Sequence, residues 1–363
     1  MRSLRSWRVD AVYGEPLDGI AVVEVPADLA PLLAEAHRRL RGRPAGIHAG
    51  DGAVVEVGDA PGPGWVDPPD EVVAALESAS HPVVLAGPGV VLDGAVPGLH
   101  ALVSSGSLGV LNTWGAKGIF DWRSRHHLAT VGLQQLDFAR GGLADADLIV
   151  ATGVDEREAR ADWRLAPVVE VAPGSLGPLA ERWGRARTDI VVPPLRADLA
   201  RITQAGWAAA TRPLPPTRVT RHYGEVLGGG GLVAADPGVA GYWVARTFAT
   251  TGLGGAQVPA DPAATGFAVA CVIVAGLYDP GRAVLAVVDD LGEVHERLLE
   301  VAGRLGVPVP VEVWSAEGEA LDADAHRRRL EHLVATGGWS SVATDARQLD
   351  EMVAVAGPIV AWT

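Results

Sequence analysis

Two adjacent carboxylates, Asp289 and Asp290, follow an apolar run at residues 283–288. The run is short and rich in valine, which is typical of a buried strand. Ligands of parallel α/β sheets bind beyond the carboxyl ends of the strands, so Asp290 stands where chemistry is expected. The alternative is that both acids are solvated at the start of the next helix, where the helix dipole favours negative charge.

Glycine-rich turns are the second feature that could serve chemistry. Gly254 and Gly255 close the loop Thr-Gly-Leu-Gly-Gly, and Gly87 and Gly89 form a Gly-Pro-Gly turn after an apolar run. Glycine lacks Cβ and reaches unusual backbone angles, so the chain can approach a phosphate closely at such turns.

Lys117 lies in the loop Gly-Ala-Lys-Gly and could contact a phosphate held by the turn at Gly87 and Gly89. That part of the chain could therefore bind a nucleotide. It lacks a Gly-x-Gly-x-x-Gly fingerprint, and a lysine in a loop is more often solvated. A purely structural role for the turn is the alternative.

Alternating apolar runs and helical segments must position these residues. Between Gly230 and Trp314 the pattern indicates strand, glycine loop, buried helix, strand, helix and strand, and a similar alternation covers residues 70–194. We therefore expect an α/β protein with two Rossmann-like parallel-sheet domains, at residues 70–194 and 221–363. Residues 1–69 are expected to form a small α/β segment with strands at 9–13 and 20–25, a helix at 29–40 and a hairpin at 45–57.

Proline marks the expected connections. Residues 60–69 hold four prolines, and residues 193–220 hold five prolines, so both read as linkers. Beyond Trp314 we expect a charged helix at 324–333, a short strand at 341–343, a helix at 345–355 and a last strand at 358–362.

Composition excludes several functions. The chain has 363 residues and a net charge of -14, which argues against nucleic acid or an anionic membrane as partner. Its single cysteine, Cys271, lies in an apolar segment and is expected to be a buried, inert thiol. His126 and His127 have no metal-ligand partners at helical spacing. The uncharged run at 262–278 favours a buried core or interface helix over a membrane span, so a cytoplasmic protein is expected.

The C-terminal part resembles the diphosphate-binding domain of thiamine diphosphate enzymes of the acetolactate synthase type. The resemblance rests on an Asp-Pro-Gly opening, a Trp-x-x-Arg, the glycine loop and a Pro-Ala-Ala-x-Gly helix start, at residues 236–238, 243–246, 252–255 and 262–266. It implies a cofactor held through Mg²⁺ by an Asp and an Asn. The metal motif falls on Asp289-Asp290-Leu291, and the position of the Asn falls near Ser315.

These departures predict an eroded site. Leu291 would put an apolar branch where a diphosphate must lie, Asp289 would add negative charge, and the only asparagine of the chain is Asn112. Asp290, Gly254 and Gly255 are therefore interpreted as a vestigial diphosphate site, with thiamine diphosphate and Mg²⁺ implied by the resemblance but lost.

Residues 70–194 resemble the central domain of the same enzymes, through an Ala-Gly-x-Gly turn, the loop around Lys117 and an Ala-Asp-Leu strand that ends in Gly153. The resemblance implies either FAD or ADP binding or a structural domain. The family also needs an N-terminal pyrimidine domain with an activating Glu. About 70 residues precede the expected central domain, fewer than such a domain takes, and Glu24 is expected to be an ordinary strand residue.

Three functions remain open. The first is a catalytically eroded homologue that acts as a scaffold, regulatory or partner subunit. The second is a thiamine diphosphate-dependent carboligase or decarboxylase on 2-oxo acids, completed by a partner chain that supplies the pyrimidine domain. The third is small-molecule or nucleotide binding in the central domain or an interdomain cleft. The glycine-rich, nearly uncharged run at 247–278 predicts a homodimer or larger oligomer.

Overall fold

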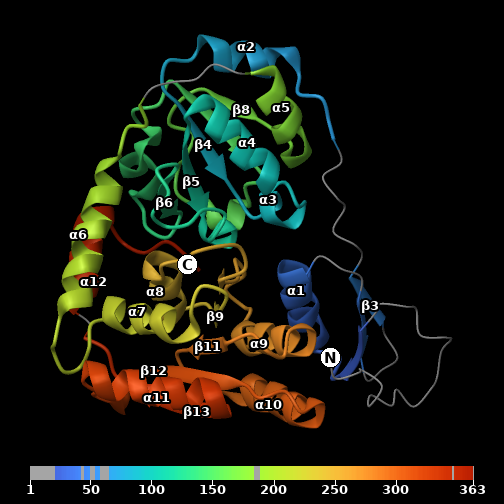
Figure 1. Cartoon of the computed structure of the whole chain (residues 1–363), viewed down its shortest axis with the longest axis vertical. Coiled ribbons are helices and arrows are strands. Elements are labelled where there is room, and N and C mark those ends of the chain that lie inside the picture. The colour runs from blue at the N-terminus through green and yellow to red at the C-terminus, as the bar shows by residue number, and fades with distance from the viewer. Residues whose placement is uncertain are drawn as a thin grey trace.

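The computed structural model describes residues 21–41, 45–49, 54–57, 65–183, 189–345 and 347–362. They form three separate sheets, two of five strands and one of three (Figure 1). Both five-stranded sheets are parallel, so the expected α/β class with two Rossmann-like units is confirmed. Among these residues no helix is long and apolar enough to cross a membrane.

The C-terminal sheet has the strand order β10-β9-β11-β12-β13. Side chains of β9 alternate between its two faces, because successive residues of a strand point in opposite directions. Helices α9 and α10 cover one face, and α7, α8 and α11 cover the other. The strands are β9 (Leu232–Ala235), β10 (Ala256–Gln257), β11 (Val284–Val288), β12 (Pro310–Glu319) and β13 (Gly338–Val342). The helices are α7 (Pro216–Leu227), α8 (Val239–Thr247), α9 (Phe267–Tyr278), α10 (Glu293–Leu305) and α11 (Ala323–Thr336).

The central sheet has the order β6-β5-β4-β7-β8. Its strands are short and mostly buried, which is typical of a parallel sheet covered on both faces. The strands are β4 (Pro82–Ala86), β5 (Gly109–Thr113), β6 (His127–Val131), β7 (Leu148–Thr152) and β8 (Val168–Glu170). The helices are α2 (Asp70–Ser78), α3 (Gly89–Leu92), α4 (Val96–Gly106) and α5 (Leu176–Arg182).

The N-terminal sheet pairs β1 (Ala21–Val25) in parallel with β2 (Ala45–Ala49), which continues into an antiparallel pairing with β3 (Val54–Val57). The expected hairpin is therefore confirmed. The helix α1 (Ala30–Arg41) packs against β2 and β3 of this sheet and also against α9 of the C-terminal part (Figure 1). The strand expected at 9–13 and the linker residues 60–64 lie outside the described residues.

Two expectations are wrong. The proline-rich segment at 193–220 is not a linker, because it forms α6 (Pro194–Ala208) and the start of α7. Proline is well tolerated in the first turn of a helix, where its missing N–H has no partner to lose. Residues 358–362 are not a strand: Ile359 makes only an isolated bridge to Gln134, after the helix α12 (Arg347–Ala356).

The central and C-terminal parts share one hydrophobic core. A single cluster joins Leu85 and Ile149 of the central sheet to Val233 and Leu285 of the C-terminal sheet. The contact is also polar, since the indole of Trp114 donates to the carbonyl of Pro259 at 3.2 Å. The two parts therefore meet beside the carboxyl end of β5.

Candidate functional site

Asp236, which follows β9, caps the start of α9. Its carboxylate accepts the backbone N–H groups of Gly266 and Ala268 at 2.6 and 2.7 Å. The Nε2 atom of His295 lies 2.8 Å from the same carboxylate. Because α9 is apolar on all sides, its first N–H groups need a polar partner from elsewhere in the chain. The carboxylate of Asp236, the Asp of the Asp-Pro-Gly motif, therefore serves as a cap for the buried helix α9.

Asp289, which follows β11, does the same for α8. Its two oxygens accept the N–H groups of Val239 and Ala240 at 2.7 and 2.8 Å. Gly238 has φ +135°, and a Cβ there would lie 2.1 Å from the Asp289 carboxylate. Burial raises the pKa of Asp289, the two N–H groups oppose that rise, and the negative charge of Asp236 adds to it. The N-terminus of α8, a natural place for a phosphate, is therefore occupied by a carboxylate of the chain itself.

Asp290 is exposed, and it lies beside this closed edge just before α10. Leu291 turns inward and packs against the core formed by α9 and α10. The next strand, β12, continues past Ser315 to Glu319, so no asparagine meets Asp290 at the strand ends. Among the described residues, no group of three or more His, Cys, Asp or Glu side chains could hold a metal ion. The two aspartates after β11 therefore differ, because Asp289 caps α8 whereas Asp290 faces solvent.

Gly254 and Gly255 lie at the opposite edge of the same sheet. The carbonyl of Gly255 accepts the N–H of Val233, the second residue of β9. Arg282, which precedes β11, donates to the carbonyl of Gly254 at 2.7 Å. Both contacts are made where the strands begin, whereas Asp290 follows a strand end. The structure therefore does not bring Asp290 together with the glycine loop.

Gly87 and Gly89 are needed for close packing of two backbones. A Cβ on Gly87 would lie 2.2 Å from the carbonyl oxygen of Gly153, and one on Gly89 would lie 2.7 Å from the Cα of Gly153. Their N–H groups donate to the carbonyls of Thr152 and Gly153, both at 2.9 Å. The turn thus joins the ends of β4 and β7, and its N–H groups are already used.

Lys117 is buried, with only 8% of its surface exposed, so the expectation of a solvated loop lysine is wrong. It follows β5 and the short turn η2 (Trp114–Ala116) at the seam between the two large parts of the chain. A Cβ on the next residue, Gly118, would lie 2.6 Å from the carbonyl oxygen of Gly252 in the glycine loop. Burial, and then repulsion from Arg246, lower the pKa of Lys117 to about 7. Lys117 does not lie on an open phosphate-binding surface.

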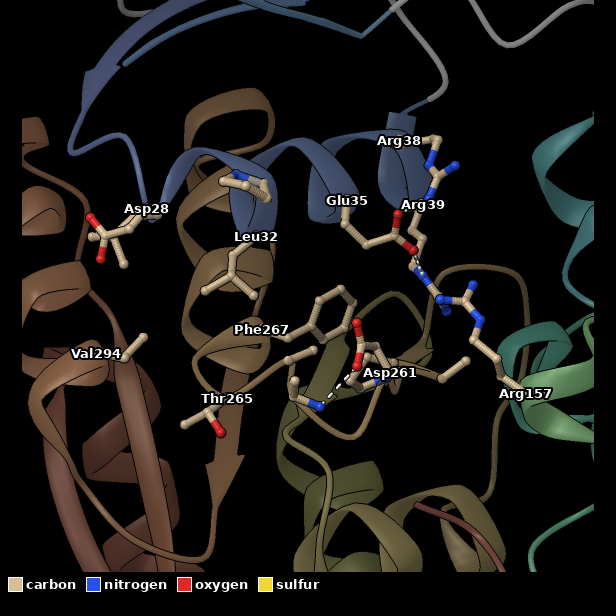
Figure 2. A pocket seen from close by; sticks show the side chains of 16 residues that line it. Asp28, Leu32, Glu35, Arg38, Arg39, Arg157, Asp261, Thr265, Phe267 and Val294 are labelled. Atoms are coloured by element: carbon tan, nitrogen blue, oxygen red, sulfur yellow. Dashed lines mark hydrogen bonds and ion pairs between the residues drawn. The ribbon is translucent and has the colours of Figure 1, made fainter. Parts of the chain in front are cut away.

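A cavity of about 410 Å³ is the site that the sequence did not indicate (Figure 2). Four segments of the chain line it: residues 28–39 around α1, the loop 259–267 before and into α9, Val294 at the start of α10, and Arg157 of the central part. Its lining mixes apolar side chains with Arg38, Arg39, Glu35 and Asp261. In the sequence, the signal for this site is limited to Arg38 and Arg39, near the end of the helix expected at 29–40.

A cluster of buried, hydrogen-bonded polar side chains was also not predicted from the sequence. Glu312, on β12, accepts a hydrogen bond from Tyr223 and lies 3.0 Å from Nε2 of His326. The Nδ1 atoms of His326 and His222 lie 2.7 Å apart. The residues come from β12, α11 and α7, and their wide separation in sequence hides the cluster. All four are buried, and the cluster ties α7 and α11 to the sheet.

Comparison with protein families matches residues 69–172 to the model described as thiamine pyrophosphate enzyme, central domain. The matched range begins one residue before α2 and includes all five strands of the central sheet. It therefore coincides with the part whose glycine turn, lysine loop and final strand carried the resemblance. The central part of this chain is similar to the central domain of thiamine pyrophosphate enzymes.

Proposed function

We propose that this chain is a catalytically eroded homologue of acetolactate-synthase-type thiamine diphosphate enzymes, acting as a scaffold, regulatory or partner subunit. The observation that carries the proposal is Asp289. Its carboxylate is bound to two N–H groups at the start of α8, where an anionic ligand would otherwise find them. A diphosphate brought to the same edge would meet Asp289, Asp290 and Asp236, and like charges at close range oppose its binding.

The N-terminal segment supports the same proposal, because it covers part of this edge. Leu32 of α1 packs against the core of α9 and α10, together with Leu291 and Val294. A Cβ on Gly266, at the start of α9, would lie 3.5 Å from Leu32. Asp28 is held to Arg297 of α10 by two hydrogen bonds of 2.6 and 2.7 Å. The N-terminal segment of this chain therefore covers the edge beside α9 and α10 through its own side chains.

Calorimetry with thiamine diphosphate and Mg²⁺ tests the proposal. The chain alone should release no binding heat at micromolar cofactor, and thermal unfolding should not shift when both are added. A dissociation constant in the low micromolar range would overturn the erosion and favour an active enzyme. Binding that requires a second protein would favour an enzyme completed by a partner chain.

A second candidate function is small-molecule binding in the cavity shared by α1, Arg157 and the loop before α9. Ligand sites prefer concave places between domains, and roughly 300–1,000 Å³ is the usual size of such a site. The cavity of about 410 Å³ falls in that range. A regulatory subunit with a lost cofactor site could use this cavity to sense a metabolite.

A cytoplasmic homodimer completes the proposal. The apolar run that motivated the dimer is now accounted for in part, because residues Phe267 to Ala275 of α9 are buried within the chain. Within this run, Leu253 of the glycine loop is an exposed large apolar side chain, at 51%, whereas the exposed Val239, at 54%, lies at the opposite edge of the sheet. A dimer contact made by this run would therefore involve the glycine loop.

A further inference from the structure

Lys117 is the only lysine among the 30 Lys and Arg residues of the chain. Only 8% of its surface is exposed, and it lies where the turn η2 of the central part meets the glycine loop of the C-terminal part. Among the residues that the structure describes, no carboxylate pairs with Lys117 and its side-chain nitrogen has no hydrogen-bond partner. Arg246, which is also buried, is by contrast paired with Asp137 at 2.7 Å. The one lysine of the chain thus stands at a buried position without an anion.

A lysine can adapt to such a position, whereas an arginine cannot. Burial of a cation without a partner is unfavourable, and a titratable group responds by losing its proton. The guanidinium of arginine stays charged in proteins, but the pKa of lysine shifts readily. Burial, and then the charge of Arg246, lower the pKa of Lys117 to about 7. Near neutral pH a large share of Lys117 is therefore a neutral amine, which is its nucleophilic form.

The groups that face Lys117 favour a negative charge in its place. Arg246 comes from α8, and its Nε atom is buried without a hydrogen-bond partner among the described residues, although Nη1 and Nη2 are bound. His127 comes from β6, and burial and then the charge of Lys117 lower its pKa. Three basic groups from different elements thus share one buried region. Replacing the ammonium by an anion would remove their repulsion and would add attraction to Arg246.

The packing around Lys117 limits the reagent to a small one. The N–H of Lys117 donates to the carbonyl of Trp114 at 3.0 Å, which fixes the backbone on one side. On the other side, Gly118 has no room for a Cβ beside the carbonyl of Gly252. Lys117 also does not line the cavity of about 410 Å³. A 2-oxo acid or a phosphate would have to open this packing, whereas a linear triatomic molecule would not.

We propose that Lys117 is a carbon dioxide site, at which CO₂ adds to the amine and forms a carbamate. The nitrogen lone pair bonds to the carbon of CO₂, one C–O π pair moves onto oxygen, and the nitrogen then releases a proton to solvent. The step needs no oxidant or reductant. The carbamate is an anion of the central part that faces Arg246 of the C-terminal part, so CO₂ strengthens the contact between the two parts. The site does not depend on the eroded-homologue proposal.

NMR with carbon-13-labelled bicarbonate at pH 8 tests the proposal, because a carbamate carbon resonates apart from bicarbonate and dissolved CO₂. The wild type should show this resonance. At equal, non-saturating dissolved CO₂, the resonance should be at least about tenfold weaker at pH 6, where the amine is protonated. Triethyloxonium converts a carbamate into a stable ester, and peptide mass mapping should find this ester on Lys117. Since the chain has one lysine, the N-terminal amine is the competing site to be checked.

Two variants separate the amine from its charge. Lys117→Met keeps an apolar stem without the amine, and Lys117→Arg keeps a cation that forms no carbamate, so both should lose the resonance. Bicarbonate at pH 8 should raise the unfolding midpoint of the wild type and of neither variant. Arg201→Met, which removes a cation with 64% of its side chain exposed, is the matched control and should keep both the resonance and the rise. Unfolding without bicarbonate shows that each variant is folded.

Each outcome decides one level of the proposal. A wild type without the resonance at pH 8, or an ester found on the N-terminal amine alone, would overturn the site. If borohydride with glyoxylate labels Lys117 while CO₂ does not, the site takes carbonyl compounds and the assignment to CO₂ is overturned. If the carbamate forms on Lys117 but the midpoint does not rise, the link to Arg246 is overturned.

Discussion

Arg246 donates from Nη2 to both carboxylate oxygens of Asp137, at 2.8 and 2.7 Å, and neither side chain is exposed to solvent. The pair joins α8 of the C-terminal part to the loop after β6 in the central part. Asp137 also accepts the N–H groups of Leu133 and Gln134, which fits an ionised carboxylate. Burial alone would lower the pKa of Arg246, but the charge of Asp137 raises it.

Removing one partner of this pair should strongly destabilise the protein. Arg246→Met leaves the Asp137 charge buried without its cation, which costs about 3–5 kcal/mol of unfolding free energy. Chemical denaturation measures the change. Arg347→Gln, which breaks an exposed pair with Asp345, is the control and should leave the denaturation midpoint nearly unchanged. Equal effects of the two substitutions would contradict the role given to burial.

Asp289 and its neighbour Asp290 should differ sharply when replaced. Asp289→Ala leaves the N–H groups of Val239 and Ala240 without acceptors and should cost about 1–2 kcal/mol, as for a lost helix cap. Asp290→Asn should cost only about 0.3–1 kcal/mol, because an exposed acid near a helix start contributes no more. Thermal unfolding with and without Mg²⁺ and thiamine diphosphate compares them. A ligand-dependent rise in the wild-type midpoint that Asp290→Asn abolishes would contradict the erosion of the site.

Acid should destabilise the fold through His222. Burial, and then the charge of His326, lower the pKa of His222 to about 4. The groups facing it are Arg218 and Glu225 of its own helix α7, with His326 of α11 and Glu312 of β12. Because the unfolded state takes up a proton near pH 6.5 and the folded state only near pH 4, stability should fall as pH drops through this window.

The measurement for His222 is the unfolding midpoint between pH 7 and pH 4. His222→Gln should show a shallower fall than the wild type, since glutamine takes up no proton when the chain unfolds. The exposed His332→Gln is the matched control and should follow the wild-type curve. His127 behaves similarly, with burial and then Lys117 lowering its pKa to about 4, so part of the fall should remain in His222→Gln.

Glu158 should act in the opposite direction. Burial raises its pKa, although the charge of Arg39 and the hydrogen bonds from Thr113 and Gly115 oppose the rise. The folded state therefore holds a proton that the unfolded state releases above pH 4.5, so stability falls as pH rises through the folded pKa. Glu158→Gln keeps an acceptor for Thr113 and Gly115 and removes the titration. Between pH 5 and pH 9, the unfolding midpoint of this variant should depend less on pH than that of the wild type. Parallel curves of midpoint against pH would contradict a raised pKa for Glu158.

The oligomeric state is a separate prediction. Light scattering at micromolar concentration should report a dimer, and Leu253→Ser should shift it toward monomer if the glycine loop forms the contact. Val353→Ser, which removes a partly exposed valine on α12, is the control. A wild-type monomer would contradict the prediction.

Local pattern in the sequence was enough to predict most elements of the fold. The apolar runs that form β4, β11 and β12 are short and bounded by turns, so the sequence predicts strands there. Strands of a parallel sheet are continuously apolar because both of their faces are buried. The buried helix α9 was predicted for the same reason, because its residues are apolar on every side. The pattern failed at 193–220, where prolines read as breakers begin two helices instead.

The site depended on tertiary structure. The sequence by itself determined that Asp290 would follow a strand. That Leu291 and the missing asparagine make this edge unsuitable for a metal stays a prediction. The sequence could not show that Gly254 lies at the edge opposite to Asp290. That position depends on how β10 pairs with β9, and strand pairing is decided by the assembled sheet. Nor could it show that α1, Arg157 and the loop before α9 enclose a cavity, since these segments lie more than 90 residues apart and meet only when three parts of the chain pack together.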